Sequence, residues 1–108
     1  MNILLTCCAG MSTSILVEYM LQECKKQGKN YNIKTVDQGI LEDELEGIDV
    51  ILLGPQVRHI LKRVEKITNG EIPVGAIRVK DYGDLNGLAV LKHAEELVEN
   101  HRNQNLSK

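Results

Sequence analysis

The sequence predicts an α/β protein with a four-stranded parallel sheet in the order 2-1-3-4 and helices on both faces. Short apolar runs alternate with longer amphipathic segments, which indicates repeated βα units joined by right-handed crossovers. Residues 50–53 are apolar throughout, as expected for an inner strand covered on both faces. In this strand order the switch point lies between the first and third strands, and ligands bind there beyond the carboxyl ends.

The first predicted strand and the first predicted helix enclose a loop of small and polar residues. Residues 2–6 form an apolar run of strand length, and helical spacing begins at Ile15. The helix is expected to end near Gly28, with Lys25 and Lys26 at the negative end of its macrodipole. Its predicted buried face consists of Ile15, Leu16, Met20, Leu21 and Cys24.

The middle of the chain contains two strands and two helical segments. Residues 31–37 alternate in polarity and are expected to form a strand at the sheet edge. The acidic segment 39–47 is predicted to be a short helix with a solvated face. The inner strand 49–53 leads through Gly54 and Pro55 into a helix at 56–69, because proline suits a first helical turn.

The last third of the chain completes the pattern. Residues 72–77 indicate a weaker fourth strand, and 78–87 a loop that carries Tyr82. The last helix is predicted at 88–100, and residues 101–108 are expected to fray. Its predicted buried face consists of Leu88, Leu91, Ala94, Leu97 and Val98. The whole arrangement is typical of flavodoxin-like and low-molecular-weight-phosphatase-like folds. Three loops then leave the carboxyl edge of the sheet: 7–14, 54–56 and the loop of Tyr82.

Composition narrows the class of protein. A length of 108 residues favours one domain spanning 1–108. A net charge of −2, with three Tyr and neither Trp nor Phe, argues against nucleic-acid binding. No stretch approaches the length of a membrane span. Cys7 and Cys8 are adjacent and could pair only with severe strain, so reduced thiols and a cytoplasmic location are expected.

Cys7 is the candidate nucleophile. It follows the first strand and precedes a helix N-terminus, whose free N–H groups and positive macrodipole end favour an anion. The pKa of this thiol is expected to fall by ~2 units from ~8.5, which corresponds to ~2.7 kcal/mol. The same donors would hold a phosphoryl group on Cys7. The competing interpretation is a small buried residue that ends a strand; Cys24 is expected in the core, and the role of Cys8 stays open.

Two other kinds of site are disfavoured. The sequence has no C-x-x-C motif and no paired histidines, since His59, His93 and His101 lie far apart, so no metal is expected. The loop after the first strand contains only Gly10 where a dinucleotide fingerprint needs three glycines. We therefore expect no cofactor.

The loop differs from a phosphatase loop at one position. Five residues follow Cys7, and the next is Thr13 where a phosphatase has the arginine that clamps the transferring phosphoryl group. Without that clamp, a phosphocysteine would be held but hydrolysed slowly, which favours a phosphoryl carrier. The alternatives are a small cysteine-dependent phosphatase or arsenate-reductase-like enzyme, and a regulatory or binding domain with an inert thiol.

A basic helix surface lies near the same edge of the predicted sheet. It contains Arg58, His59, Lys62 and Arg63. Such a surface is either a solvated helix face or a docking patch for an acidic partner.

These motifs resemble the IIB component of the bacterial phosphotransferase system, lactose/cellobiose type, along the whole chain. The residues that carry the resemblance are Cys7, Cys8, Ala9, Gly10, Met11, Ser12, Thr13 and Ser14, the run 52–56 with Pro55 and Gln56, and Tyr82, Gly83, Asn86, Gly87 and Leu88. The C-x-A-G-M-S-T-S pattern is specific to the cellobiose/chitobiose-like branch. Two positions depart from the residues that are usual in this family: Cys8 stands where Ser is common, and Asn86 stands where Asp is expected.

The resemblance implies a function. Cys7 would be the phosphorylated residue and residues 8–14 its phosphate loop, with Pro55, Gln56 and Tyr82 beside it. A phosphohistidine on a IIA protein would donate to Cys7, which would pass the phosphoryl group to a β-linked disaccharide in the membrane transporter IIC. The chain would act as a cytoplasmic monomer that docks transiently at the membrane. The identity of the sugar is not encoded here, because another protein binds it.

Overall fold

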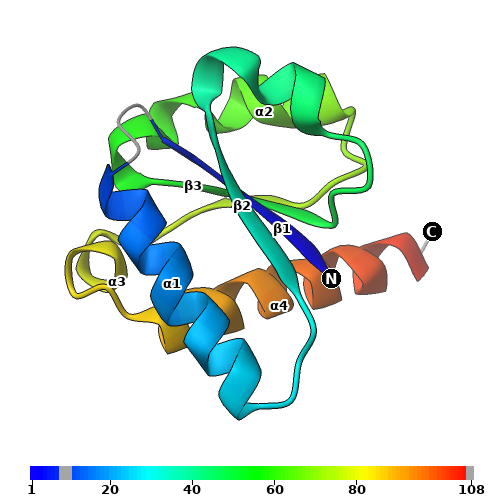
Figure 1. Ribbon diagram of the computed structural model, residues 1–108. Helices are drawn as coiled ribbons and strands as arrows, with labels where there is room; N and C mark the ends of the chain where they lie inside the picture. Colours follow the sequence, from blue (N-terminus) through cyan, green and yellow to red (C-terminus); the bar gives the residue numbers. More distant parts are fainter. Residues whose placement is uncertain (8–10, 107–108) are drawn as a thin grey trace.

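The fold is built on a parallel sheet in which the N-terminal strand lies at the centre. The computed structural model describes residues 1–7 and 11–106, including the side chains of residues 1–6 and 13–105. Its strands are β1 (Asn2–Cys7), β2 (Asn32–Asp37), β3 (Val50–Leu53) and β4 (Val74–Ala76). They pair in parallel in the order β2-β1-β3-β4, so the predicted sheet is confirmed (Figure 1).

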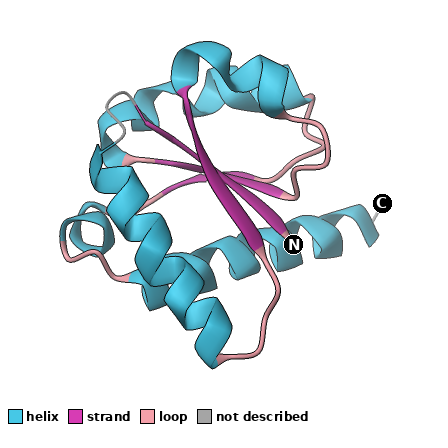
Figure 2. Ribbon diagram, viewed as in Figure 1, coloured by secondary structure: helices cyan, strands magenta, loops and turns pink. Residues whose placement is uncertain are grey.

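Helices cover both faces of this sheet, as predicted (Figure 2). The helices α1 (Met11–Lys26), α3 (Val79–Gly83) and α4 (Gly87–Leu106) lie on one face. The 3-10 helices η1 (Gln38–Glu44) and η2 (Pro55–Ile60) lie on the other with α2 (Leu61–Thr68). Along β1, Ile3 and Leu5 join the core beneath α1 and α4, and Leu4 joins the core beneath η2 and α2. Every residue of β3 is buried, as its apolar run predicted.

The buried face of α1 differs from the predicted one. The helix begins at Met11 instead of Ile15, and it buries Leu16, Val17, Met20 and Cys24. The predicted core residues Ile15 and Leu21 are 49% and 41% exposed. α1 packs against both the sheet and α4, and this double contact selects one of two neighbouring apolar rows on its surface.

Close approach of α1 and α4 depends on a glycine. A Cβ added at Gly87 would lie 2.6 Å from the carbonyl carbon of Tyr19, well inside van der Waals contact. Asn86 precedes it, and its Oδ1 accepts a hydrogen bond from the Ala89 N–H at 3.0 Å, which caps the first turn of α4. Asn86 therefore supplies the capping oxygen that an aspartate would supply at this position.

Several predicted boundaries differ from those in the structure. The segment expected as a helix at 39–47 is η1, where the Asp37 side chain accepts a hydrogen bond from the Gly39 N–H at 2.8 Å. The helix predicted at 56–69 consists of η2 and α2, since Val57 has non-helical φ and ψ of −120° and 17°. The predicted loop 78–87 contains α3, and Leu88 is 37% exposed instead of buried.

The C-terminal helix is longer than predicted. α4 continues to Leu106, through most of the tail that we expected to fray from residue 101. The His101 ring nitrogen Nε2 lies 2.8 Å from the carbonyl oxygen of Gly70, which ties the last turns to the α2–β4 connection. None of the described helices is long and apolar enough to cross a membrane.

Candidate active site at the carboxyl edge of the sheet

Three connections meet at the carboxyl edge of the sheet, as the topology predicted. β1 ends at Cys7, β3 continues through Gly54 into η2, and β4 leads into α3. Backbone hydrogen bonds join these segments: the Gly54 N–H donates to the carbonyl of Thr6 at 2.9 Å, and the Ile77 N–H to Leu53 at 2.8 Å. The residues after all three strands are therefore fixed at one end of the sheet.

Cys7 is the last residue of the central strand, opposite Asp37 in the register with β2. Cys8, Ala9 and Gly10, and the side chains of Cys7, Met11 and Ser12, lie outside the described residues. Their predicted roles therefore remain predictions. α1 begins at Met11 with no acidic residue in its first turn, so the first N–H groups lack a competing carboxylate there.

Thr13 and Tyr82 meet beside this loop. Thr13 lies in the first turn of α1 and is 2% exposed, and Tyr82 lies on α3 and is 9% exposed. Their hydroxyl oxygens are 3.2 Å apart, within hydrogen-bond distance. Sequence reasoning placed Tyr82 at this edge, but it did not pair Tyr82 with Thr13. The residue at the phosphatase arginine position thus contacts α3, and the contact joins the start of α1 to the loop after β4.

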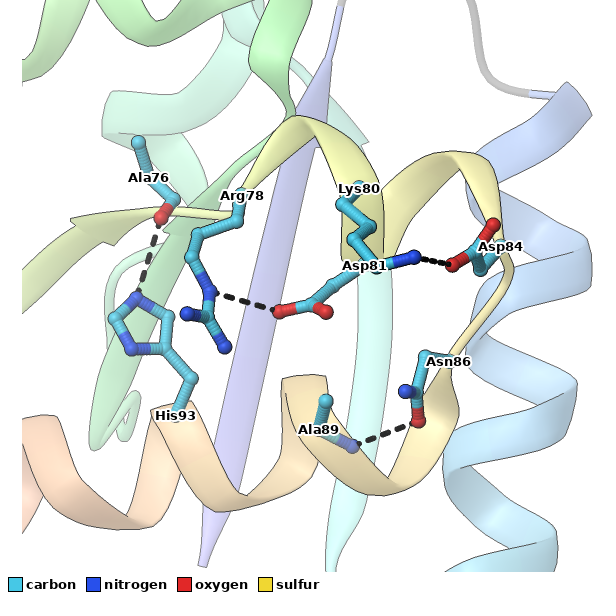
Figure 3. A network of polar contacts seen from close by, with 8 residues as sticks. All are labelled: Ala76, Arg78, Lys80, Asp81, Asp84, Asn86, Ala89 and His93. Carbon is cyan, nitrogen blue, oxygen red and sulfur yellow. Dashed lines mark hydrogen bonds and ion pairs between the residues drawn. The ribbon is translucent and has the colours of Figure 1, made fainter.

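Two ion pairs lie along α3 and the residues that flank it (Figure 3). The Arg78 Nε donates to Asp81 Oδ2 at 3.0 Å, and the Lys80 Nζ donates to Asp84 Oδ2 at 3.0 Å. Asp81 lies on α3 and Asp84 directly follows it, so both are acidic residues that could activate water at this edge. Each carboxylate therefore already faces a cation that lies three or four residues before it in the chain.

Pro55 and Gln56 lie at the same edge, in the first turn of η2. Pro55 is half-buried, whereas Gln56 is exposed. Within the described part of the chain, no hydrogen bond joins the Gln56 side chain to another residue. The structure thus places both residues near the end of β3 without connecting them to Thr13 or Tyr82.

Thr6 is a polar residue at this edge that sequence reasoning did not single out. Its hydroxyl oxygen is fully buried, and it has no hydrogen-bond partner among the described residues. A buried hydroxyl without a partner is uncommon and costly. The available signal was a threonine that follows three apolar residues and directly precedes Cys7.

Cys24 is a buried thiol with the features of an unreactive core residue. It lies in the core beneath α1, as predicted, and its burial raises the pKa of the thiol above the ordinary value. A thiol with a raised pKa has less thiolate at neutral pH and is therefore less reactive. Among the described residues, no group of three His, Cys, Asp or Glu side chains is arranged to hold a metal ion.

Comparison with known proteins agrees with the resemblance. Residues 2–93 match the family described as the lactose/cellobiose-specific IIB subunit of the phosphotransferase system (PTS). The PTS galactose-specific EIIB component of Lactococcus lactis subsp. cremoris (strain MG1363) is 38% identical over 102 residues, which cover 89% of this chain and 94% of that protein. The PTS cellobiose-specific EIIB component of Lactococcus lactis subsp. lactis (strain IL1403) gives the same identity and the same coverage.

A solved structure shows the same fold. The solution structure of a cellobiose-specific phosphotransferase IIB component from Borrelia burgdorferi superposes with a TM-score of 0.78 at 41% identity, over 94% of each chain. The family match spans most of the sequence, and the relatives are matched over nearly their whole length. This chain therefore belongs to the lactose/cellobiose-specific IIB family of the phosphotransferase system.

Proposed function

We propose that this chain is a phosphoryl carrier that uses Cys7 as its nucleophile. The observation that supports this most is the position of Cys7, at the end of the central strand and just before the N-terminus of α1. A helix N-terminus stabilises a thiolate and, after transfer, the phosphate dianion on the same sulfur. One set of backbone donors would therefore support both halves of the reaction.

The two transfer steps are displacements at phosphorus. In the first, the Cys7 thiolate attacks the phosphorus of a phosphohistidine on a IIA protein, the P–N bond breaks, and the imidazole keeps the electron pair. In the second, a sugar hydroxyl oxygen attacks the phosphorus, the P–S bond breaks, and Cys7 leaves as a thiolate while the hydroxyl proton is lost to a base. We place the sugar in the membrane transporter IIC, which this carrier approaches from the cytoplasm.

Slow hydrolysis is what distinguishes a carrier from a cysteine phosphatase. Thr13 stands where a phosphatase has an arginine, and its hydroxyl lies next to that of Tyr82. Asp81 and Asp84 are each paired with a cation. Position 13 therefore has no guanidinium to clamp the phosphoryl group, and neither aspartate is free to act as an acid. An arginine clamp and a free acid would both favour transfer of the phosphoryl group to water.

We propose a β-linked disaccharide as the final acceptor, as the C-x-A-G-M-S-T-S motif implies. The two relatives from Lactococcus lactis carry different sugar names, galactose and cellobiose, at the same 38% identity. Because galactose is a monosaccharide and cellobiose is a β-linked disaccharide, overall similarity does not choose between them, and the proposal rests on the motif.

Intact-mass measurement after mixing with phosphorylated IIA protein tests this function. A carrier gains one stable phosphoryl group and loses it when transporter and sugar are added. Steady release of free phosphate without the transporter would identify a phosphatase instead. An unchanged mass would identify a domain with an inert thiol, and it would overturn the proposal.

A further inference from the structure

A second surface of the molecule is strongly basic. The outer side of η2 and α2 exposes Arg58, Lys62, Arg63 and Lys66, and none of these four forms an ion pair with a described residue. Glu65 is the only acidic residue of the two helices, so they carry a net charge of +3 by formal count. The whole chain carries −2, and the rest of it therefore carries −5. We call these four residues the basic strip.

The same face of the sheet also has an acidic part. η1 and the residues after it expose Glu42, Asp43 and Glu46 beside β2, whereas the basic strip lies on the side of β3 and β4. Both segments pack on one apolar cluster that includes Leu41 and Val57. Opposite charges are therefore separated across one face, so a charged surface would orient the molecule as well as attract it.

The strip lacks the side chains that protein interfaces use as anchors. Binding energy between proteins concentrates in buried aromatic and large apolar residues. The exposed large apolar residues of the described chain are Ile15, Tyr19, Leu21, Ile40, Val79 and Leu88, and none of them lies on η2 or α2. A predominantly cationic surface without such an anchor suits the diffuse negative charge of lipid headgroups.

We propose that the basic strip binds anionic phospholipid headgroups and sets the face formed by η2 and α2, whose first turns lie next to the carboxyl edge of the sheet, on the membrane surface. This inference rests on the proposed function, in which Cys7 must reach a sugar inside a membrane transporter. η2 begins directly after β3, so Arg58 lies within the first turns from the carboxyl edge. At physiological salt, charges act over about 8 Å, so the strip acts only once the carrier is next to the bilayer. Lipid binding would thus concentrate the carrier where its acceptor is.

Vesicle binding tests the proposal with the purified chain. The probes are vesicles of phosphatidylcholine mixed with phosphatidylglycerol and vesicles of phosphatidylcholine alone, separated by sedimentation. The test variant is Lys62→Glu/Arg63→Glu. The matched control is Lys92→Glu/Arg102→Glu, which changes the net charge equally at two exposed positions of α4. Circular dichroism melts verify that both variants fold.

The proposal expects binding to the anionic vesicles only, and binding that weakens as salt is added. Each basic residue near an anionic surface changes the partition coefficient on the order of five-fold. Lys62→Glu/Arg63→Glu should therefore bind at least about 25-fold more weakly, whereas the α4 control should retain most of the binding. Equal losses in the two variants, or no binding by the natural chain, would overturn the proposal.

A separate readout distinguishes this inference from the proposed function. Lys62→Glu/Arg63→Glu should still accept a phosphoryl group from the IIA protein at the natural rate, because lipid plays no part in that step. Slow phosphorylation of this variant would assign the strip to an acidic partner protein and overturn lipid binding. A natural chain that binds vesicles but never gains a phosphoryl group would instead refute the carrier function and leave the lipid site standing.

Discussion

Replacing Tyr82 with phenylalanine tests whether the contact between α3 and α1 positions the phosphate loop. The substitution removes one hydroxyl and keeps the ring, so the apolar packing of Tyr82 stays in place. The lost contact is the hydrogen bond to Thr13, with the two oxygens 3.2 Å apart in a buried setting. A neutral hydrogen bond contributes about 0.5–1.5 kcal/mol to stability, and we expect urea denaturation to show a loss of that size.

The matched control is Tyr31→Phe. The Tyr31 hydroxyl donates to Glu95 Oε2 at 2.7 Å, and Tyr31 precedes β2 at the opposite edge of the sheet. A hydrogen bond to a charged group contributes about 1.5–3 kcal/mol, so the control costs at least as much stability. The assay is the rate of Cys7 alkylation against pH, because this rate follows the thiolate fraction. Every protein in the comparison also carries Cys8→Ser, so that alkylation of Cys8 does not contribute to the rate. Cys24 is buried and is therefore shielded from the reagent.

Tyr82→Phe should shift the pH midpoint of Cys7 alkylation upward and slow phosphorylation, because the first turn of α1 would be held less firmly under the thiolate. Tyr31→Phe should leave both quantities unchanged despite its larger loss of stability. The reasoning is refuted if the two variants give the same alkylation profile, or if the midpoint in the natural loop is no lower than that of a free thiol.

Three further predictions concern the clamp position, the helix contact and an acidic group. Thr13→Arg should shorten the lifetime of the phosphocysteine by intact mass, because a guanidinium fork stabilises the spreading charge; a folded variant with a longer lifetime contradicts this. Gly87→Ala should lower the free energy of unfolding in urea by about 1–3 kcal/mol, because its Cβ would meet the Tyr19 backbone, whereas a gain would refute the close contact. For Glu95, burial raises the pKa, but hydrogen bonds from Lys29 and Tyr31 outweigh it and leave the pKa below its ordinary value. Its contribution to stability is therefore present above the unfolded-state pKa of about 4.3 and lost as pH falls through the lower folded-state pKa, and Glu95→Gln should flatten urea stability over that range.

The sheet was predictable from the sequence because its signals are local. An apolar run at 50–53 marks a strand that is covered on both faces. Short apolar runs that alternate with amphipathic segments indicate that the strands are parallel, as the structure shows. The basic surface of η2 and α2 was also visible in the sequence. Only the structure shows that these basic residues form no ion pairs with described residues, because a sequence does not show which acidic residues lie beside them.

Tertiary contacts account for the predictions that were wrong. α1 carries apolar residues in two adjacent rows, and only its contact with α4 shows that Ile15 lies outside the core. The polar end of α4 stays helical, and its His101 ring contacts the carbonyl of Gly70, which lies 31 positions earlier in the chain. No periodicity in residues 101–106 indicates that contact.

The candidate site was predictable in position but not in its internal contacts. The strand order and the motif placed the end of β1 and the loop of Tyr82 at one edge, and the structure confirms that topology. The pairing of Tyr82 with Thr13 spans 69 positions, and a single sequence carries no signal for it. The buried Thr6 hydroxyl was overlooked because threonine is common in strands.

The most direct test of the account is to identify the phosphorylated residue. Cys7→Ser and Cys8→Ser are each mixed with phosphorylated IIA protein, and intact mass is measured with circular dichroism as the control for folding. We predict that Cys8→Ser gains one phosphoryl group and that Cys7→Ser gains none, because a serine hydroxyl at neutral pH is a far weaker nucleophile than an activated thiolate. A folded Cys7→Ser protein that still gains the group, beside a Cys8→Ser protein that does not, would contradict the central role of Cys7.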